Sequence, residues 1–219
     1  MKSKTYYPVF ADLTGRRCVV VGGGPVAQRK VTTLLRFGAQ VTVVSPTTVP
    51  RLTTYARQGK IRHLARRFRP TDLRGAWLVY AATDDERINE LVSRHATRAR
   101  IFTNVVDQPR LCSFIAPSIF KRGNLVVAVS TGGASPTIAK LLRRELQQTI
   151  GRDYARMVRL LKGLRTAAKR KLPSYGDRKD YFARLVNGRV FQLVRAGRLA
   201  RARREALALL EQSVVRNGS

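Results

Sequence analysis

A glycine-rich segment, GGGPVA at residues 22–27, has the spacing of a site for a phosphate-containing cofactor. It fits the pattern G-x-G-x-x-A and lies between an apolar run and a helical pattern, the context in which this motif has a mechanism. Gly22 permits a tight turn, Gly24 lets the backbone approach a pyrophosphate, and Ala27 lets the helix pack closely against a sheet. The N–H groups at the start of the helix then attract the phosphates. The motif predicts dinucleotide binding, with a purely structural strand–helix turn as the alternative.

The residues after the second apolar run bear on which dinucleotide binds. An NAD site usually has Asp or Glu at the end of the second strand, where the acid binds the ribose hydroxyls. Here the run is followed by Ser45, Pro46 and Thr47, none of which is acidic. Ser45 or Thr47 can supply a hydroxyl or backbone contact instead, and nearby Arg51 favours the 2′-phosphate of NADP. These residues alone leave NAD and NADP both open.

Two later apolar runs also end in polar residues, and ligands of such sheets bind beyond the carboxyl ends of the strands. Thr83 and Asp84 follow one run, where they fit the N-cap of a helix as well as a binding site. Asn104 and Asp107 end the other. In a strongly basic chain, Asp107 is a candidate general base beside a bound substrate. A turn-forming aspartate before Gln-Pro is the alternative.

The remaining reactive side chains do not assemble into a known centre. His63 and His95 are far apart in the sequence, and each fits a surface or core position. Cys18 and Cys112 can form at most one bridge, and neither has the spacing of a zinc ligand. A second glycine loop, at residues 131–136, precedes a helical pattern and fits either another anion site or a flexible link. The sequence therefore predicts no site for a resident metal.

These candidate residues lie among alternating strand and helix patterns that extend to residue 113. We predict strands at residues 17–21, 41–44, 61–64, 77–82 and 102–106. The helical spacing of apolar residues predicts helices at 25–37, 49–57 and 85–97. Strands that alternate with helices are typical of an α/β fold, here a Rossmann-type doubly wound parallel sheet covered on both faces.

The pattern changes after residue 113. Two apolar runs, at 114–119 and 125–130, predict an antiparallel hairpin with its turn at 121–124. Ser135 and Pro136 then fit the start of a helix that extends to residue 151. Residues 152–219 contain only basic amphipathic helical patterns, with predicted breaks at Pro173, Gly176, Gly188 and Gly197. We therefore expect a Rossmann domain at 1–113, a small α+β dimerisation region at 114–151 and a helical domain at 152–219.

Composition narrows the class of protein. The 219 residues carry a formal net charge of +30, yet 44% are hydrophobic, which is close to ordinary globular domains and excludes a disordered basic tail. No apolar run is long enough to span a membrane, and the N-terminus lacks a secretory signal, so we expect a soluble cytoplasmic protein. The charge indicates an anionic partner, which can be nucleic acid, a polyphosphate cofactor or a polycarboxylate substrate. A generally solvated basic surface is the alternative.

Four motifs together resemble the precorrin-2 dehydrogenases, which are stand-alone enzymes or the N-terminal half of fused sirohaem synthase. These motifs are GGGPVAQRK at 22–30, ATDD at 82–85, NVVD at 104–107 followed by Ser113-Phe114, and STGGASP at 130–136 followed by Leu142-Arg143. The resemblance covers roughly residues 5–215, so we expect no counterpart of the methyltransferase half of the fused enzyme.

The resemblance implies NAD-dependent oxidation of precorrin-2 to sirohydrochlorin by an intertwined homodimer. Many family members then insert Fe²⁺, as a substrate rather than a resident cofactor, to give sirohaem. Asp107 matches the aspartate that the family uses in catalysis. The candidate cofactor-binding residues are Gly22, Gly24, Pro25, Val26, Ser45, Pro46, Thr47 and Thr83. The candidate substrate-binding residues are Asn104, Ser113, Thr131 and Gly132.

Two other functions remain open at this stage. One is a dehydrogenase without chelatase activity, which nothing in the sequence distinguishes from the bifunctional enzyme. The other is a basic Rossmann-type sensor or nucleic-acid-binding protein. The sequence shows no aromatic-rich stacking surface and no helix-turn-helix pattern, so we expect no specific nucleic acid partner and no membrane partner.

Overall fold

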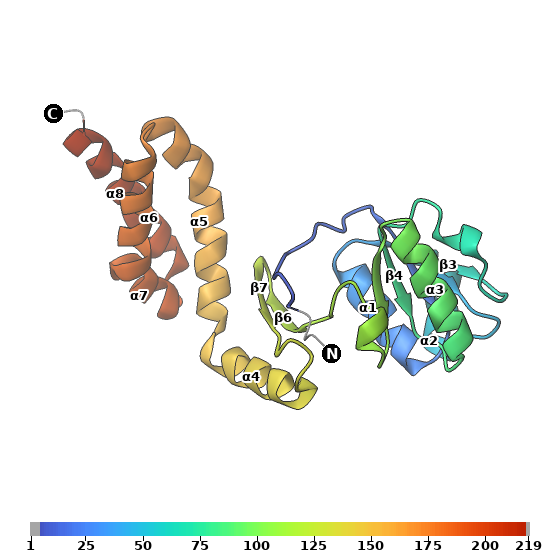
Figure 1. Cartoon of the computed structure of the whole chain (residues 1–219). Helices are drawn as coiled ribbons and strands as arrows, with labels where there is room; N and C mark the ends of the chain where they lie inside the picture. The colour runs from blue at the N-terminus through green and yellow to red at the C-terminus, as the bar shows by residue number, and fades with distance from the viewer. Residues whose placement is uncertain (1–4, 218–219) are drawn as a thin grey trace. The chain divides into compact units, whose positions relative to one another are not determined.

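The computed structural model describes residues 5–217, which form two compact units (Figure 1). The first unit contains the chain up to Ala116 together with Gly132–Ala134. The second contains Pro117–Thr131 and the chain from Ser135 onward. The predicted division into three domains, with boundaries after residues 113 and 151, stays a prediction.

A five-stranded parallel sheet forms the centre of the first unit, in the order β3-β2-β1-β4-β5. Its strands are β1 (Arg17–Val21), β2 (Gln40–Val44), β3 (Ile61–Leu64), β4 (Leu78–Ala81) and β5 (Phe102–Val105). β1, β2 and β4 are largely apolar because the inner strands of a parallel sheet are buried on both faces, whereas the edge strands β3 and β5 include polar residues. The order reverses beside β1, so the carboxyl ends of β1 and β4 flank the point where such sheets bind ligands. The predicted Rossmann-type α/β fold is confirmed.

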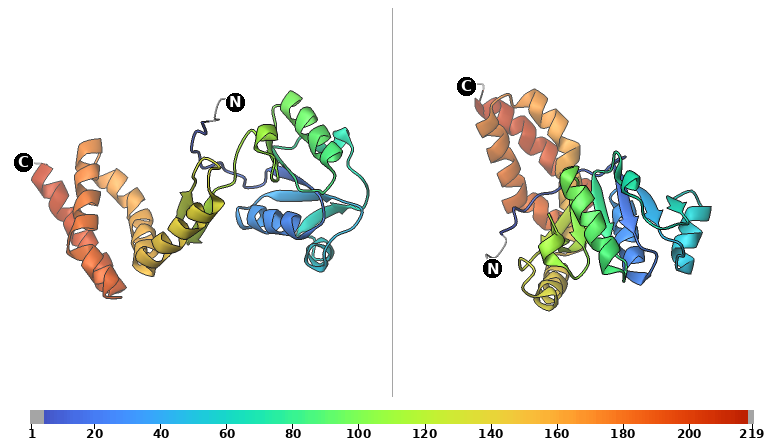
Figure 2. Two further views of the ribbon diagram at one scale, coloured as in Figure 1. Left: turned by 60° about the horizontal axis from the view of Figure 1, so that its bottom comes forward. Right: turned by 45° about the vertical axis from the view of Figure 1, so that its right-hand side comes forward.

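Helices cover both faces of this sheet (Figure 2). α1 (Pro25–Arg36) and α2 (Pro50–Arg57) pack on one face, where Val20 and Val43 are fully buried. α3 (Glu86–Arg98) and the short 3₁₀ helix η1 (Pro70–Leu73) cover the other face. Alternate residues of β1 face opposite sides, which is why its whole run is apolar.

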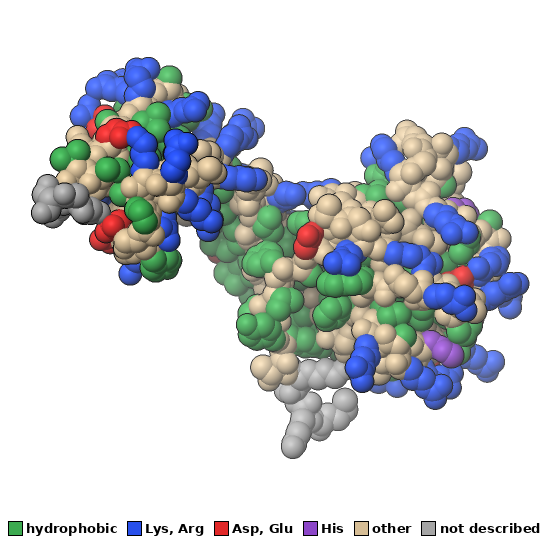
Figure 3. Space-filling model, turned by 90° about the horizontal axis from the view of Figure 1, so that it is seen from above, with side chains coloured by type: hydrophobic (Ala, Val, Ile, Leu, Met, Phe, Trp, Pro, Cys, Tyr) green, Lys and Arg blue, Asp and Glu red, His purple; other side chains and the backbone are tan. Residues whose placement is uncertain are grey.

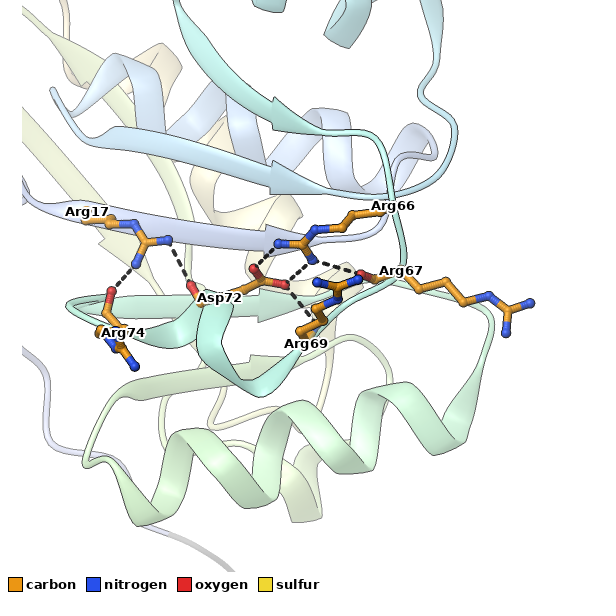
Figure 4. Close-up of polar contacts among 6 residues, drawn as sticks. All are labelled: Arg17, Arg66, Arg67, Arg69, Asp72 and Arg74. Carbon is orange, nitrogen blue, oxygen red and sulfur yellow. Dashed lines mark hydrogen bonds and ion pairs between the residues drawn. The ribbon is translucent and has the colours of Figure 1, made fainter.

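The loop between β3 and β4 is held by a buried carboxylate that the sequence did not single out (Figure 4). Asp72 is 5% exposed, and both of its oxygens accept hydrogen bonds from the Arg66 guanidinium, at 2.6 and 2.8 Å. The backbone N–H of Arg69 donates to the same carboxylate at 2.8 Å, and Arg17 donates to the Asp72 carbonyl at 2.8 Å. The bidentate pair of Arg66 and Asp72 closes the loop on itself, and the hydrogen bond from Arg17 ties the loop to the start of β1.

The second unit begins with an antiparallel hairpin, β6 (Ser118–Arg122) and β7 (Leu125–Val129). Five helices follow among the described residues: α4 (Pro136–Thr149), α5 (Arg152–Lys171), α6 (Tyr175–Asn187), α7 (Arg189–Arg195) and α8 (Leu199–Asn217). α5 to α8 share a core that includes the fully buried Leu185 and Val194. Breaks at Pro173, Gly188 and Gly197 match the prediction.

Two predictions about this unit are wrong. The first hairpin strand lies at 118–122 rather than 114–119, and its turn is confined to Gly123 and Asn124. The reason is that Phe114 packs against the core of the first unit, with its ring 5.5 Å from that of Tyr80. Gly176 does not break a helix but lies in the first turn of α6, where the cost of glycine is smaller than in a helix interior.

Basic side chains are spread over the molecule rather than gathered in one tail. Figure 3 shows Lys and Arg across the visible face of both units, with few Asp and Glu among them. None of the helices described for residues 5–217 is long and apolar enough to cross a membrane.

Candidate functional site

The glycine loop between β1 and α1 has the close approaches that its motif predicts. Gly22 has a φ of 121°, and a Cβ at this position would lie 2.2 Å from the carbonyl oxygen of Ala82. Only glycine therefore lets the loop pass the end of β4. Ala27 is fully buried where α1 packs on the sheet, so both structural roles inferred from the motif are confirmed.

The middle glycine has a role that the motif alone did not reveal. A Cβ on Gly23 would lie 1.9 Å from the carbonyl oxygen of Thr47 and 2.8 Å from Ser45 Oγ. The Gly23 carbonyl also accepts a hydrogen bond from the N–H of Val49, at 2.9 Å. Gly23 thus docks the glycine loop against the loop after β2. No local signal marks this contact, because the two loops are distant in sequence.

The start of α1 is open to a phosphate group. Gly24 is the N-cap residue, no side chain caps the helix, and its first turn contains no acidic residue. A Cβ at Gly24 would meet no atom within 4 Å. Pro25 has no N–H, so the donors at this helix end are those of Val26 and Ala27. The residues present therefore fit the pyrophosphate of a dinucleotide.

The loop after β2 lies beside the glycine loop, as the predicted cofactor site requires. Ser45 is buried and its carbonyl bonds to His63 Nε2 at 2.9 Å, whereas Pro46 and Thr47 are exposed. His63 is half-buried and bonds to the backbone, so it lies between the surface and core positions expected for it. Arg51 directs its Nε to the Tyr55 hydroxyl at 3.1 Å and stacks on that ring.

At the end of β4, the N-cap of α3 is Asp85 rather than Thr83 or Asp84. Asp85 Oδ1 accepts from the N–H of Ile88 at 3.2 Å. The Thr83 hydroxyl instead bonds to the side chain of Asn89 at 2.9 Å. Asp85 caps because the helix begins one residue later than predicted. Thr83 remains at the carboxyl edge of the sheet, and its contact with a cofactor stays a prediction.

Asp107 lies in a strained turn just beyond β5. The N–H of Gln108 donates to the carbonyl of Val105 at 3.3 Å, which closes a turn through Val106 and Asp107. Asp107 has a φ of 58° and an exposed side chain. Left-handed backbone is uncommon in residues other than glycine and is concentrated at functional sites. Asp107 is therefore both a turn residue and an exposed carboxylate at the ligand-binding edge of the sheet.

The two predicted substrate-binding residues near Asp107 are engaged with the backbone. Asn104 is 8% exposed, and its Nδ2 donates to the carbonyl of Phe114 at 3.0 Å. Ser113 Oγ accepts from the N–H of Thr103 at 2.8 Å. Both contacts bind the returning segment to β5. A direct contact of either side chain with substrate stays a prediction.

Cys112 and Gln108 complete this turn. Cys112 Sγ lies 3.2 Å from both the N–H and the carbonyl of Val105, and neither Cys112 nor Cys18 is in a disulfide. Gln108 Oε1 is buried and has no hydrogen-bond partner among the described residues.

The second glycine loop is shaped by its own hydrogen bonds. Thr131 Oγ1 accepts from the N–H of Ser135 at 2.9 Å, and Ser135 Oγ accepts from Ile138 as the N-cap of α4. Gly132 and Gly133 have φ values of 66° and 93°. The capping prediction for Ser135 is confirmed, whereas substrate binding by Thr131 and Gly132 stays a prediction.

Comparisons with known proteins agree with this arrangement. Residues 9–118 match a family model described as NAD(P)-binding. Residues 122–149 match the central region of sirohaem biosynthesis proteins, and residues 153–210 match the sirohaem synthase dimerisation region.

Relatives and a solved structure match nearly the whole chain. A siroheme synthase of Thioalkalivibrio sulfidiphilus is 45% identical over 206 residues, which are 94% of this chain and 42% of that protein. Siroheme synthase 1 of Aeromonas salmonicida is 41% identical over 97% of this chain and 46% of its own length. The chain thus spans less than half the length of these curated relatives. The structure of SirC, a precorrin-2 dehydrogenase, has a TM-score of 0.76 at 28% identity and covers 94% of this chain and 100% of its own.

The three family models follow one another along the chain in the order of the elements described above. The first of them covers the glycine loop, the loop after β2 and the turn at Asp107. This chain therefore belongs to the family of sirohaem synthases and precorrin-2 dehydrogenases, and residues 9–118 are its NAD(P)-binding domain.

Proposed function

We propose that this protein is a precorrin-2 dehydrogenase, which oxidises precorrin-2 to sirohydrochlorin with NAD. The observation that carries the proposal is the strained, exposed Asp107 at the same sheet edge as the open phosphate site of Gly24. The names of the matching sirohaem synthases and of SirC support the substrate.

The residues around the glycine loop would hold the cofactor. The N–H groups of Val26 and Ala27 would bind the pyrophosphate, and Ser45 and Thr47 would lie near the adenosine ribose. Arg51 already donates to Tyr55 and stacks on its ring. That engagement draws Arg51 away from a 2′-phosphate, which supports NAD rather than NADP.

Oxidation of precorrin-2 removes one hydride and one proton. The nicotinamide ring, when bound, supplies the hydride acceptor. Asp107 would accept the proton as a general base, since its carboxylate is exposed and makes no ion pair among the described residues. The net charge of +30 would attract the polycarboxylate substrate and speed its capture.

A homodimer is the assembly that we propose for this chain. One family model is described as a dimerisation region, and α4 presents an apolar stripe to solvent. The stripe consists of Ile138, Leu141, Leu142 and Leu146, which are 36–48% exposed. These residues recur at helical spacing, so one contiguous face of α4 is available to a second copy.

An anaerobic assay with precorrin-2 generated in situ tests the proposed reaction. With NAD we expect the absorption spectrum of sirohydrochlorin to appear, and with NADP a much lower rate. No turnover with either nucleotide, from protein that is folded by circular dichroism, would overturn the proposal.

Addition of Fe²⁺ to the same reaction tests a second activity. Among the described residues, no group of three or more His, Cys, Asp or Glu is placed to hold a metal ion. The proposal itself concerns dehydrogenation, and iron insertion is tested separately. Conversion of the product to sirohaem, faster than in a control without protein, would extend it to iron insertion.

A further inference from the structure

We propose that Lys30 is a substrate-binding residue, whose ammonium binds a carboxylate of the tetrapyrrole and positions the macrocycle beside Asp107. This inference rests on the proposed function and deepens it. Lys30 was not among the residues that the sequence predicted to bind substrate.

The position of Lys30 is fixed by the aromatic ring beneath it. Lys30 Nζ lies 4.9 Å from the ring centroid of Tyr80, near the carboxyl end of β4. The Tyr80 ring in turn meets Phe114 edge-on at 5.5 Å, and Asn104 donates to the Phe114 carbonyl. A cation over an aromatic face is held by the ring quadrupole. The contact with the Tyr80 ring therefore holds the ammonium at the carboxyl end of the sheet.

Lys30 is near Asp107 because β4, which carries Tyr80, pairs with the edge strand β5. Tyr80 of β4 and Asn104 of β5 are direct partners in the sheet, and Asp107 follows Asn104 by three residues. Side chains on a helix point back toward its N-terminus, so Lys30 extends from α1 toward the phosphate end of the site. The ammonium and the candidate base thus flank one region of the sheet edge.

The Lys30 ammonium forms no direct ion pair among the described residues. Lys30 is half-buried, yet among residues 5–217 its Nζ forms no ion pair and no hydrogen bond to an oxygen atom. Burial and the neighbouring Arg29 lower the pKa of Lys30, and Asp107 and Cys112 only partly oppose them. A bound carboxylate would stabilise the charged ammonium, and carboxylates are the groups that the proposed substrate carries in abundance.

The chain offers a matched control in Lys60. Its Nζ also lies over a tyrosine ring, 5.7 Å from the centroid of Tyr55. Lys60 immediately precedes β3, so it is at the amino end of the parallel sheet, the edge opposite Asp107. Substitution of Lys60 removes the same charge and the same type of contact away from the site.

The test compares Lys30→Met with Lys60→Met in equilibrium titrations of sirohydrochlorin and, separately, of NADH. Methionine keeps an unbranched side chain over the ring and removes the charge. We expect Lys30→Met to weaken sirohydrochlorin binding by about tenfold or more, the usual size of one lost charge-assisted hydrogen bond. We expect Lys60→Met to change it less than about twofold, and NADH binding to remain at the wild-type value in both variants. Lys30→Arg should restore most of the affinity, because it restores the charge.

Each other outcome overturns the inference. Equal sirohydrochlorin affinity in Lys30→Met and Lys60→Met would show that no carboxylate binds Lys30. Weakened NADH binding in Lys30→Met would place the residue in the cofactor site instead. If Lys30→Met fails to fold, Lys30→Gln is used in the same comparison. Wild-type turnover separates the two proposals: active wild-type enzyme with an unaffected Lys30 variant refutes this inference alone, whereas inactive wild-type enzyme refutes the proposed function.

Discussion

Substitution of the two outer glycines of the loop by alanine should separate binding from folding. At Gly24 the added methyl group meets no protein atom within 4 Å, and the backbone, at φ −82° and ψ −173°, suits alanine. At Gly22 the methyl group would lie 2.2 Å from the Ala82 carbonyl oxygen, with φ at 121°. Gly24→Ala therefore tests the ligand site, whereas Gly22→Ala tests the fold.

The expected stability changes follow from these contacts. At the N-cap, alanine is worse than glycine by roughly 0.5–1 kcal/mol, but it restricts the unfolded chain and regains about 0.4–1 kcal/mol. Gly24→Ala should thus change the free energy of unfolding by less than about 0.5 kcal/mol. Gly22→Ala combines a backbone conformation that costs about 1–3 kcal/mol with a collision that shifts the loop, so we expect a loss of about 3 kcal/mol or more.

Gly24→Ala should weaken NADH binding although it leaves the stability nearly unchanged. The methyl group of Gly24→Ala would separate the pyrophosphate from the N–H groups at the start of α1. Loss of one hydrogen bond to a charged group costs about 1.5–3 kcal/mol, which is a tenfold or larger increase in Kd. Urea unfolding measures the first quantity and NADH fluorescence titration the second. A Gly24→Ala protein that is fully folded and binds NADH with wild-type affinity would refute a phosphate site at this helix end.

Three further predictions concern single side chains. Asp107→Asn should reduce turnover by about 10²–10⁴-fold without changing NADH affinity. Its stability should stay at the wild-type value, because asparagine also tolerates left-handed backbone. Retained activity in steady-state kinetics would exclude Asp107 as the base. Asp72→Asn should lower the free energy of unfolding by about 1–3 kcal/mol at pH 7, because Arg66 and Arg69 N lose a charged acceptor. Arg66 lowers the pKa of Asp72 below its unfolded value of about 3.9. The difference in free energy of unfolding between wild type and Asp72→Asn should therefore be complete above about pH 3.9 and disappear as the pH falls through the folded pKa. Urea unfolding from pH 7 to 3 in which this difference stays constant would contradict the prediction. Burial raises the pKa of Cys18 to about 11, so iodoacetamide at pH 8 should label Cys18 in urea and leave it unlabelled in native protein, as mass spectrometry can show.

The sheet and the glycine loop were predictable because their signals are local. A strand buried on both faces must be apolar throughout, and β1, β2 and β4 are such runs. The G-x-G-x-x-A pattern is likewise contained in residues 22–27, and the turn and packing roles of Gly22 and Ala27 follow from its spacing.

The errors arose where tertiary contacts decide the local structure. Phe114 has the apolar character of a strand residue, but its ring packs with Tyr80, which delays the hairpin by four residues. Gly23 and Lys30 act through contacts with residues of other elements, Thr47 and Tyr80. Such partners are distant in the sequence, so no periodicity or motif spacing identifies them.

The turn at Asp107 shows how residues predicted to bind substrate can also position the candidate base. The strain of a left-handed aspartate persists only where neighbouring contacts impose it. Here Asn104 fastens the returning chain at Phe114, Ser113 bonds to Thr103, and Cys112 Sγ contacts both backbone groups of Val105. These contacts close the segment from β5 to Phe114 around the turn and hold Asp107 exposed at the sheet edge. Asn104 and Ser113 therefore contribute to the site through the conformation of Asp107, a role that needs no contact with substrate.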